Sequence, residues 1–346
     1  MRAIRMYEHG GPDVLRLEDV PDPQPGFGEA LVRVHAVAVN RLDLWVRENV
    51  GHALKTTLPL VPGYDVAGEV VELGPDTSGA VVGDRVYVHP NNACGRCRFC
   101  LDGDEALCAD FGIMGVDRDG GYAELVAAPA KNLIPLGPAT SFEAAAAVGS
   151  VYLTAYHMVS ARAKLRAGET VLVMAAGSGV GGAALRLARW AGARVLATAG
   201  SAEKRERAKE EGAEHAIDYT VPDWHEEVLR VTDGQGADVI VDHTGSTYFA
   251  GSLRSLASRG RLVVCGASSG AAAAVDLIDL FTRQLSLIGS SDGTPRELAE
   301  VFRLLDQGVI DPRIDTVLPL ADAAAAQERL ARRDHYGRVL LCPVKG

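Results

Sequence analysis

The spacing of apolar residues differs between the two parts of the chain. Up to about residue 140, short apolar stretches partly alternate with polar positions and are interrupted by glycine and proline, as at Leu31–Val37, Val66–Leu73 and Arg85–Val88. Alternation with a period of two predicts strands. We therefore expect the first part of the chain to form a compact, mostly β domain.

The hydrophobic pattern changes at Phe142. A helix is predicted over Phe142–Val159, and a regular alternation of apolar strands and helices follows it. Strands are predicted at Thr170–Ala175, Arg194–Ala199, His215–Tyr219, Ala237–His243, Gly260–Gly266 and Leu285–Gly289, and further helices at Val180–Ala191, Ala202–Glu211 and Pro295–Gln307. Such alternation predicts an α/β domain with a doubly wound parallel sheet. A last strand, Gly337–Val344, is expected to return to the β domain and make it discontinuous.

Composition and charge narrow the class of protein. The 346 residues are 47% hydrophobic and include 38 glycines, which suits two domains rich in tight turns. A net charge of −10 argues against nucleic acid and anionic membranes as main partners. The sequence has no apolar run of the roughly 18 residues that span a bilayer, and its first residues read as a strand rather than a signal peptide. We expect a soluble, cytoplasmic protein.

A glycine-rich loop follows the first strand of the α/β series. Glycine lets the backbone turn sharply and approach a pyrophosphate, and the next helix offers free N–H groups at its start. This strand–loop–helix context predicts a dinucleotide site, the alternative being a turn needed only for packing. The candidate residues are Gly177, Ser178, Gly179, Val180 and Gly181.

The end of the next strand predicts which dinucleotide binds. A carboxylate there would bond the ribose 2′-hydroxyl of NAD, but the residue is Ala199. Ser201 and Lys204 could bind a 2′-phosphate, and Tyr219 could close over the same pocket. The pattern favours NADP, with NAD possible; in the plainer alternative, Lys204 is a solvated charge on a helix.

Four of the six cysteines crowd into one short segment as Cys94, Cys97, Cys100 and Cys108. Four thiolates this close can surround one tetrahedral zinc ion and leave no coordination position for water or substrate. The spacing therefore predicts one structural zinc per chain. The alternatives are two disulfides or four reduced thiols.

These motifs together resemble the medium-chain dehydrogenase/reductase superfamily, which contains zinc alcohol dehydrogenases and quinone oxidoreductases. The matching stretches, in chain order, are Asn40–Asp43, Pro62–Gly68, Gly83–Val86, the four cysteines, Gly120–Glu124, Thr154–Tyr156 and the glycine loop. The resemblance implies a GroES-like domain over residues 1–147 with a zinc lobe at 92–110, a Rossmann domain over 148–290, and a return over 291–346. It also implies hydride transfer with a nicotinamide cofactor contacted by Thr154, a small carbonyl substrate, and a dimer or tetramer.

The chain departs from the zinc alcohol dehydrogenases at the positions that hold their second, catalytic zinc. By motif matching these positions fall on Asn40, Tyr64 and Ser150. Amide, phenol and hydroxyl groups are poor zinc ligands at neutral pH. The stretches around Asp43 and Asp65 resemble the quinone oxidoreductase branch instead, although that branch generally lacks the four-cysteine lobe.

Chemistry without zinc needs another group to stabilise developing oxyanion charge. Asn40 could donate an amide N–H, Tyr64 could donate its O–H or a proton, and Asp43 could orient either group. In the plainer alternative, Tyr64 only fills space. His243 ends a strand where cofactor loops begin, and His157 is expected to be a packed histidine.

The sequence therefore predicts an NADPH-dependent reductase of quinones or other α,β-unsaturated carbonyl compounds. Hydride delivery to such activated acceptors is easier without a Lewis acid than delivery to a simple ketone. Two alternatives remain: a zinc-containing alcohol or aldehyde dehydrogenase, and a non-catalytic nucleotide-binding protein that senses redox state.

Overall fold

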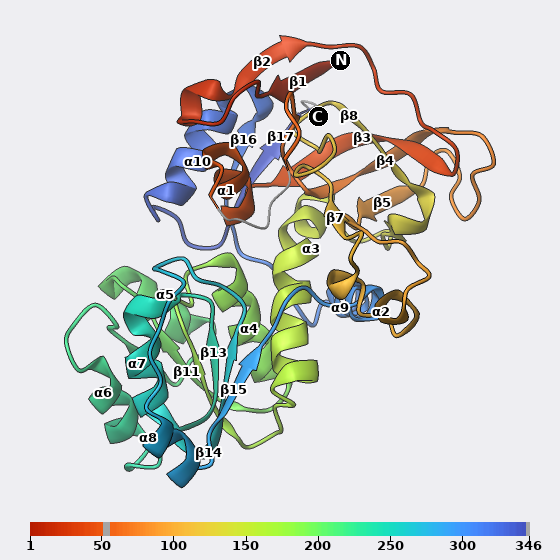
Figure 1. Ribbon diagram of the computed structural model, residues 1–346. Coiled ribbons are helices and arrows are strands. Elements are labelled where there is room, and N and C mark those ends of the chain that lie inside the picture. Colours follow the sequence, from red (N-terminus) through yellow and green to blue (C-terminus); the bar gives the residue numbers. More distant parts are fainter. Residues whose placement is uncertain (51–55, 344–346) are drawn as a thin grey trace. The chain divides into compact units, whose positions relative to one another are not determined.

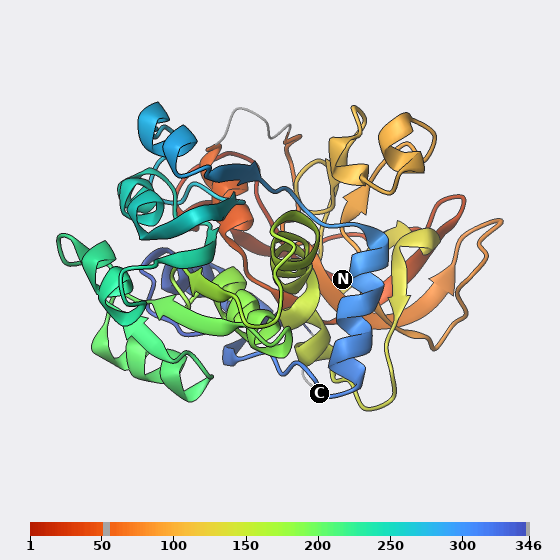
Figure 2. The ribbon, with the colours of Figure 1, turned by 90° about the horizontal axis from the view of Figure 1, so that it is seen from below.

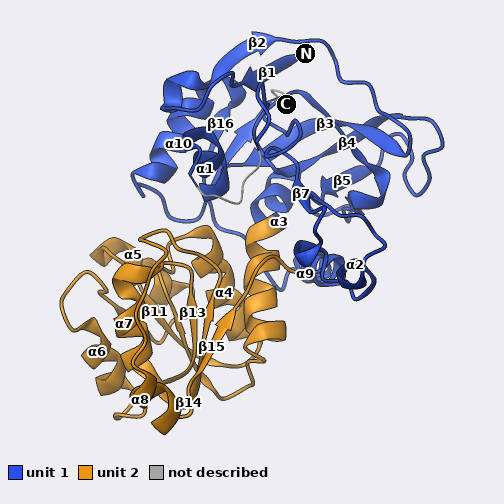
Figure 3. Cartoon of the chain, viewed as in Figure 1, with its two compact units in different colours: residues 1–149, 294–346 blue, residues 150–293 orange. Residues whose placement is uncertain are grey.

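The computed structural model describes residues 1–50 and 56–343. The chain forms two compact units, Met1–Gly149 with Thr294–Gly346, and Ser150–Gly293 (Figure 3). These boundaries lie close to the expected ones at 147/148 and 290/291. The last residues of the expected tail strand and domain, 344–346, lie outside the described residues.

The first unit is mostly β. Its strands are β1 (Arg2–Arg5), β2 (Arg16–Asp19), β3 (Glu29–Ala38), β4 (Asp65–Leu73), β5 (Arg85–Val88), β6 (Asn91–Asn92), β7 (Gly112–Ile113), β8 (Leu125–Pro129), β9 (Leu133–Pro135), β16 (Ile314–Pro319) and β17 (Arg338–Cys342). Its helices are α1 (Arg41–Glu48), α2 (Arg98–Leu101), α9 (Pro295–Asp306) and α10 (Ala323–Ala331), and it shares α3 (Phe142–Tyr156) with the second unit, which begins at Ser150. Within the described ranges, the main sheet runs β16-β17-β3-β4-β5-β9, and β8 also pairs with β3.

The alternating strands bury one face of this sheet in an apolar core that includes Val32, Val66, Val86 and Val339. The end of the chain contributes directly, because β17 pairs antiparallel with β3 through Leu340 and Leu341. Figure 2 shows α9, in blue, beside the strands of the N-terminal part of this unit. Segments from both ends of the sequence therefore build one domain.

Helix α3 differs from the continuous helix expected over Phe142–Val159. It bends at Gly149, where an added Cβ would lie 2.4 Å from Asp65 Oδ1 and 2.6 Å from Tyr87 Oη. A side chain would collide with these buried polar groups, so the close approach requires glycine. A π-helical turn over His157–Arg162 then follows the helix.

The second unit contains the expected parallel sheet. Its strands are β10 (Thr170–Val173), β11 (Arg194–Thr198), β12 (His215–Ile217), β13 (Ala237–Asp242), β14 (Leu256–Val264) and β15 (Ser286–Gly289). Its further helices are α4 (Gly179–Trp190), α5 (Ala202–Glu210), α6 (Trp224–Val231), α7 (Ser246–Ser255) and α8 (Leu277–Thr282). Across the part of the chain that is described, the order is β12-β11-β10-β13-β14-β15, with all neighbours parallel (Figure 1).

The strand ends differ from the sequence expectation by a few residues. Strand β12 stops at Ile217, so Tyr219 lies in the following turn, and β14 begins at Leu256 rather than Gly260. The fold class itself, a β domain joined to a doubly wound α/β domain, is as predicted. Among the described residues, the helices are too short or too polar to cross a membrane.

Candidate functional site

The first candidate site begins where β3 leads into α1. The main-chain N–H of Asn40 donates to Asp43 Oδ2 over 2.7 Å. Asp43, the third residue of α1, thus caps the helix by bonding to the residue that precedes it. Asn40 and Asp43 are only 4% and 1% exposed. This local pairing brings together two of the three residues expected to be catalytic.

Asp65, at the start of β4, is the centre of the surrounding hydrogen-bond network. Its Oδ2 accepts from Asn40 Nδ2 and from Arg338 Nη2, both at 3.0 Å. Its Oδ1 accepts from Tyr87 Oη at 2.8 Å. The carboxylate is fully buried, and three donors from three other elements compensate for its loss of water. Below, the buried polar cluster means Asn40, Asp43, Asp65, Tyr87, Tyr122 and Arg338.

The side-chain amide of Asn40 has no hydrogen left for a substrate. It donates one N–H to Asp65 and the other to the Ala38 carbonyl at 3.1 Å. An amide group carries only two such hydrogens. The structure thus differs from the expectation that Asn40 donates to a substrate, because the neighbouring carboxylate and main chain already use both donors.

Burial sets the protonation of the second carboxyl group. It raises the pKa of Asp43 to about 7, although hydrogen bonds from the Asn40 main chain and from Tyr122 act in the opposite direction. Tyr122 donates its O–H to Asp43 Oδ2 at 3.1 Å. Burial and the neighbouring Asp43 raise the pKa of Tyr122 well above its usual value, so this phenol stays protonated.

His89 was not anticipated from the sequence. Because Val66 pairs with Val88, His89 lies opposite Asp65 by continuation of the antiparallel register. It is 4% exposed, and burial lowers its pKa to about 4, so the imidazole is neutral near pH 7. Neither ring nitrogen has a hydrogen-bond partner among the described residues. The period-two row of Arg85, Tyr87 and His89 was the available sequence signal.

The other residues matched to the cleft of zinc alcohol dehydrogenases fall in different places. Tyr64 is half-buried and directly precedes Asp65, and its electrostatic interaction with Tyr122 contributes to the raised pKa of Tyr122. Ser150 and Thr154 lie on α3, in the part of that helix that belongs to the second unit. Within the first unit, the structure therefore groups Asn40, Asp43 and Tyr64.

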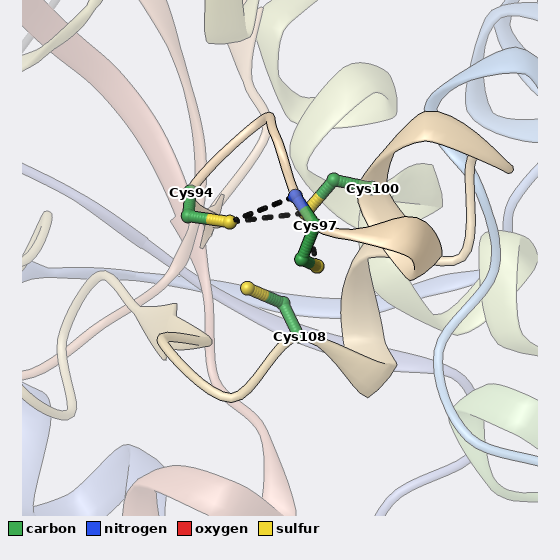
Figure 4. A group of neighbouring side chains, drawn as sticks. All are labelled: Cys94, Cys97, Cys100 and Cys108. Carbon is green, nitrogen blue, oxygen red and sulfur yellow. Dashed lines mark hydrogen bonds between the residues drawn. The ribbon is translucent and has the colours of Figure 1, made fainter.

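The four cysteines form a separate site in the first unit, with their sulfurs turned toward one another (Figure 4). All four Sγ atoms lie within 4.8 Å of one another, with separations of 3.5 Å for Cys97–Cys100 and 3.9 Å for Cys94–Cys100. A tetrahedral zinc with bonds of about 2.3 Å places its sulfurs roughly 3.8 Å apart. The separations thus fit four ligands of one ion.

The thiols of this site differ in acidity. Main-chain N–H groups of Arg96 and Cys97 lower the pKa of Cys94 to about 6. Burial and the neighbouring thiols raise the pKa of Cys100 to about 12. Four thiolates would repel one another, so a bound cation is what would allow all four to ionise.

In the second unit, the glycine loop joins β10 to α4 as expected. Ser178 caps the helix, accepting from the Gly181 N–H at 3.0 Å. A Cβ on Gly181 would lie 2.3 Å from the Ala175 carbonyl oxygen, so glycine is needed for the close approach of helix and loop. The main-chain N–H groups at the start of α4 suit a pyrophosphate.

The residues expected to choose the cofactor gather around the end of β11. Ala199 follows the strand and is buried, and Ser201 caps α5 by accepting from the Lys204 N–H at 3.3 Å. An added Cβ on Gly200 would lie 3.6 Å from Tyr219 Oη, so the tyrosine lies over this turn. Its ring also packs edge-on against Tyr248.

Comparison with known proteins places these features in a family. The alcohol dehydrogenase GroES-like domain model matches residues 26–138, and the zinc-binding dehydrogenase model matches residues 179–307. Quinone oxidoreductase from Rattus norvegicus is 32% identical over 335 residues, covering 95% of this chain and 93% of that protein. NAD-dependent alcohol dehydrogenase from Sulfurisphaera tokodaii is 31% identical over 352 residues, covering 99% and 100%.

A solved structure of an NAD-dependent alcohol dehydrogenase agrees over almost the whole length. It has a TM-score of 0.95 and 45% identity, and the match covers 99% of this chain and 100% of that one. The likeness therefore includes both units rather than the dinucleotide fold alone. The chain belongs to the medium-chain dehydrogenase/reductase superfamily of oxidoreductases.

Proposed function

We propose that the protein is an NADPH-dependent reductase of quinones or other α,β-unsaturated carbonyl compounds that acts without a catalytic zinc ion. The observation that carries this proposal is the state of Asn40, whose amide hydrogens are both bonded within the protein. An amide in this arrangement holds Asp65 in place and is a poor zinc ligand.

The charge balance of the buried polar cluster supports the same proposal. The guanidinium of Arg338 lies 3.0 Å from the Asp65 carboxylate in a pair that is 7% and 0% exposed. Asp65 is thus already neutralised by a protein cation. Tyr64 and Ser150 offer only neutral oxygen atoms at neutral pH, which compete poorly with water for zinc.

In this proposal Tyr64 holds the proton that balances reduction. A nicotinamide cofactor, when bound, supplies the hydride. Asn40 and Asp43 are positioning residues, because they fix the start of α1 and the Asp65 carboxylate next to Tyr64 in the chain. An activated acceptor needs less electrophilic assistance than a simple ketone, which suits a phenol in place of a metal.

NADPH is favoured over NADH by the turn after β11. Ala199 places no carboxylate at the end of this strand, so nothing there bonds the ribose 2′-hydroxyl or repels a 2′-phosphate. Ser201, Lys204 and Tyr219 surround the same turn and would hold the phosphate. The glycine loop from Gly177 to Gly181 would hold the pyrophosphate.

A screen of quinones, enones and alcohols with both cofactors tests the proposed activity. We expect turnover of quinones or enones with NADPH, and none that depends on added zinc. Oxidation of simple alcohols as the main activity, lost on chelation while the fold persists, would contradict the proposal. Binding of cofactor without turnover of any acceptor would favour a nucleotide sensor.

Tyr64→Phe tests the proton donor. Loss of a general acid typically lowers the rate by about 10²–10⁴-fold. We expect that fall in single-turnover rate with little change in NADPH affinity. Tyr7→Phe, at an exposed tyrosine of the same unit, is the control. An unchanged rate in Tyr64→Phe would mean that Tyr64 only fills space and donates no proton.

Ala199→Asp tests the cofactor preference. We expect about a tenfold or greater shift toward NADH, since a buried carboxylate would repel the 2′-phosphate. Fluorescence titration of both cofactors gives the ratio of dissociation constants. Wild-type protein that binds NADH as tightly as NADPH would contradict the assignment.

The four-cysteine site is proposed to hold one structural zinc per chain. All four ligand positions are thiols, so a bound zinc would have no open position for chemistry. Its contribution is to hold together a segment with little apolar core, in which Leu101 and Leu107 are exposed. Metal content is the direct measurement.

A zinc alcohol dehydrogenase remains the second candidate, because several relatives are named NAD-dependent alcohol dehydrogenases. The solved structure at 45% identity is an NAD-dependent alcohol dehydrogenase. Two zinc ions per chain, together with chelator-sensitive alcohol oxidation, would establish this alternative.

We also propose that the protein self-associates through the second unit. Strand β15 ends the order of the parallel sheet, and Leu277, Ile278 and Phe281 of the preceding helix α8 are each about two thirds exposed. An edge strand beside exposed apolar groups is a natural place for a second copy to pair. Light scattering should give a dimer or tetramer, and Phe281→Glu should reduce its mass.

A further inference from the structure

His243 lies at the carboxyl end of β13, beside the loop that follows β10. These strands are neighbours, and the chain leaves β10 toward β11 on its other side. The order in which the chain adds strands therefore reverses between β10 and β13. In open parallel sheets, ligands bind outside the carboxyl ends of the strands at such a point. His243 and Ser178 both belong to this edge.

The two side chains are in direct contact. Ser178 Oγ lies 2.8 Å from His243 Nε2 and also accepts the Gly181 N–H at 3.0 Å. His243 Nδ1 is buried and has no hydrogen-bond partner among the described residues. Burial lowers the pKa of His243, so the ring is neutral near pH 7 and carries a single N–H.

The position of that hydrogen follows from the available partners. If Nδ1 carried it, a buried N–H would be left unpaired, which proteins rarely tolerate. If Nε2 carries it, Nδ1 is a bare acceptor, which is the less costly state. The neighbouring carboxylate of Asp242 accepts from Thr244 and Ser252 and is not bonded to His243, whose Nδ1 has no partner among the described residues. The hydrogen therefore belongs on Nε2 and is donated to Ser178.

This assignment decides what Ser178 can do. A hydroxyl group has two acceptor lone pairs and one hydrogen. The Gly181 N–H and the His243 Nε2–H occupy both lone pairs. The hydroxyl hydrogen must then point away from both groups, and it is available as a donor at the start of α4, where an anion is favoured.

We propose that His243 is a positioning residue that holds Ser178 as a hydrogen-bond donor to the pyrophosphate of the dinucleotide. The inference rests on the proposed dinucleotide binding and adds a residue from a different strand to it.

Binding of three probes by variants tests the proposal. The probes are NADPH, ADP-ribose, which keeps the pyrophosphate without nicotinamide, and adenosine 2′-monophosphate, which lacks it. We expect His243→Phe to weaken NADPH and ADP-ribose by about tenfold, the typical effect of losing a hydrogen bond to a charged group. Affinity for adenosine 2′-monophosphate should not change.

Two further variants separate positioning from simple packing. His243→Gln keeps an N–H donor near the place of Nε2 and should recover most of the affinity. Ser178→Ala should lose affinity to the same extent as His243→Phe, and the double variant should lose no more than either alone. Ser178→Ala also keeps the test open if His243→Phe does not fold.

The outcomes for the inference and for the proposed function are distinct. Equal loss of all three probes, additive losses in the double variant, or no recovery in His243→Gln would overturn the role of His243. Wild-type protein that binds neither NADPH nor ADP-ribose would overturn the proposed dinucleotide binding, and the role of His243 with it.

Discussion

The four-cysteine site and the buried polar cluster lie in the same unit but differ in where their polar groups come from and in how far they are buried. The cysteine site takes all its ligands from one stretch of fifteen residues, Cys94 to Cys108, and three of its four thiols are partly exposed. The cluster takes its groups from the start of α1, from β4, β5 and β17, and from the segment before β8, and all of them are buried. In our proposal the cysteine site takes up an external ion, whereas the groups of the cluster bond mainly to one another.

The difference teaches what decides whether a polar site is open to a metal. In the cluster, both carboxylate oxygens of Asp65 already accept hydrogen bonds, one of them from the Arg338 guanidinium, so little capacity is left for a further cation. In the cysteine site, the thiols converge with only weak mutual hydrogen bonds. A soft, unsatisfied set favours zinc, whereas a satisfied set of nitrogen and oxygen groups does not.

Removing one ligand from the cysteine site should have the largest effect. Structural zinc binding is worth on the order of 10 kcal/mol in small modules, so Cys97→Ser should abolish tight zinc binding and lower stability. Plasma mass spectrometry on protein without a His-tag should find one zinc per chain in the wild type and none in the variant. Cys342→Ser, outside the site, is the control and should keep one. Two zinc ions per chain in the wild type would contradict the conclusion that the buried polar cluster leaves no place for a metal ion.

Breaking the buried ion pair should have the next largest effect. Arg338→Met leaves the Asp65 carboxylate without its cation, and losing one partner of a buried pair typically costs about 3–5 kcal/mol. Urea unfolding measures the change. Arg303→Met removes an exposed pair with Glu300 and should cost less than about 1 kcal/mol. Adding Asp65→Asn to Arg338→Met should recover part of the loss; no recovery would mean that packing, not charge, is responsible.

His89, which lies opposite Asp65 of the cluster, should make the unfolding free energy of the protein depend on pH. Its pKa is near 4 in the fold against an ordinary 6.5, so the unfolded chain takes up the proton first as pH falls. Stability is therefore lost between about pH 6.5 and 4, by about 3 kcal/mol.

His89→Leu should flatten this part of the profile. Asp43, with its pKa raised to about 7, acts in the opposite direction: its stability contribution falls as pH rises from its ordinary 3.8 toward 7. The difference between wild type and His89→Leu isolates the histidine. Parallel profiles for the two proteins would contradict its assignment as a buried neutral group.

The smallest of these effects is expected for Tyr87→Phe. It removes the hydrogen bond that Tyr87 donates to Asp65, and a hydrogen bond to a charged group contributes about 2 kcal/mol. Tyr7→Phe, which removes an exposed hydrogen bond to Glu18, should change the unfolding free energy by less than about 0.5 kcal/mol. Equal effects of the two substitutions would mean that water replaces the lost donor at Asp65.

The sequence alone determined the features that depend on neighbours in the chain. The cysteine spacing, the glycine loop before α4 and the alternation of strands and helices all involve residues a few positions apart. Local periodicity and ligand spacing are sufficient there, because the backbone geometry of a turn or helix fixes which groups meet.

The tertiary structure decided which polar groups remain free to act. Arg338 and Asp65 are 273 positions apart, and no local pattern pairs them. Asp65 also takes one amide hydrogen of Asn40, which the sequence had offered as a donor to substrate. A side chain at Gly149, where α3 bends, would collide with the same carboxylate. Hydrogen-bond capacity is finite, so the role of a side chain depends on partners that only the folded chain brings together.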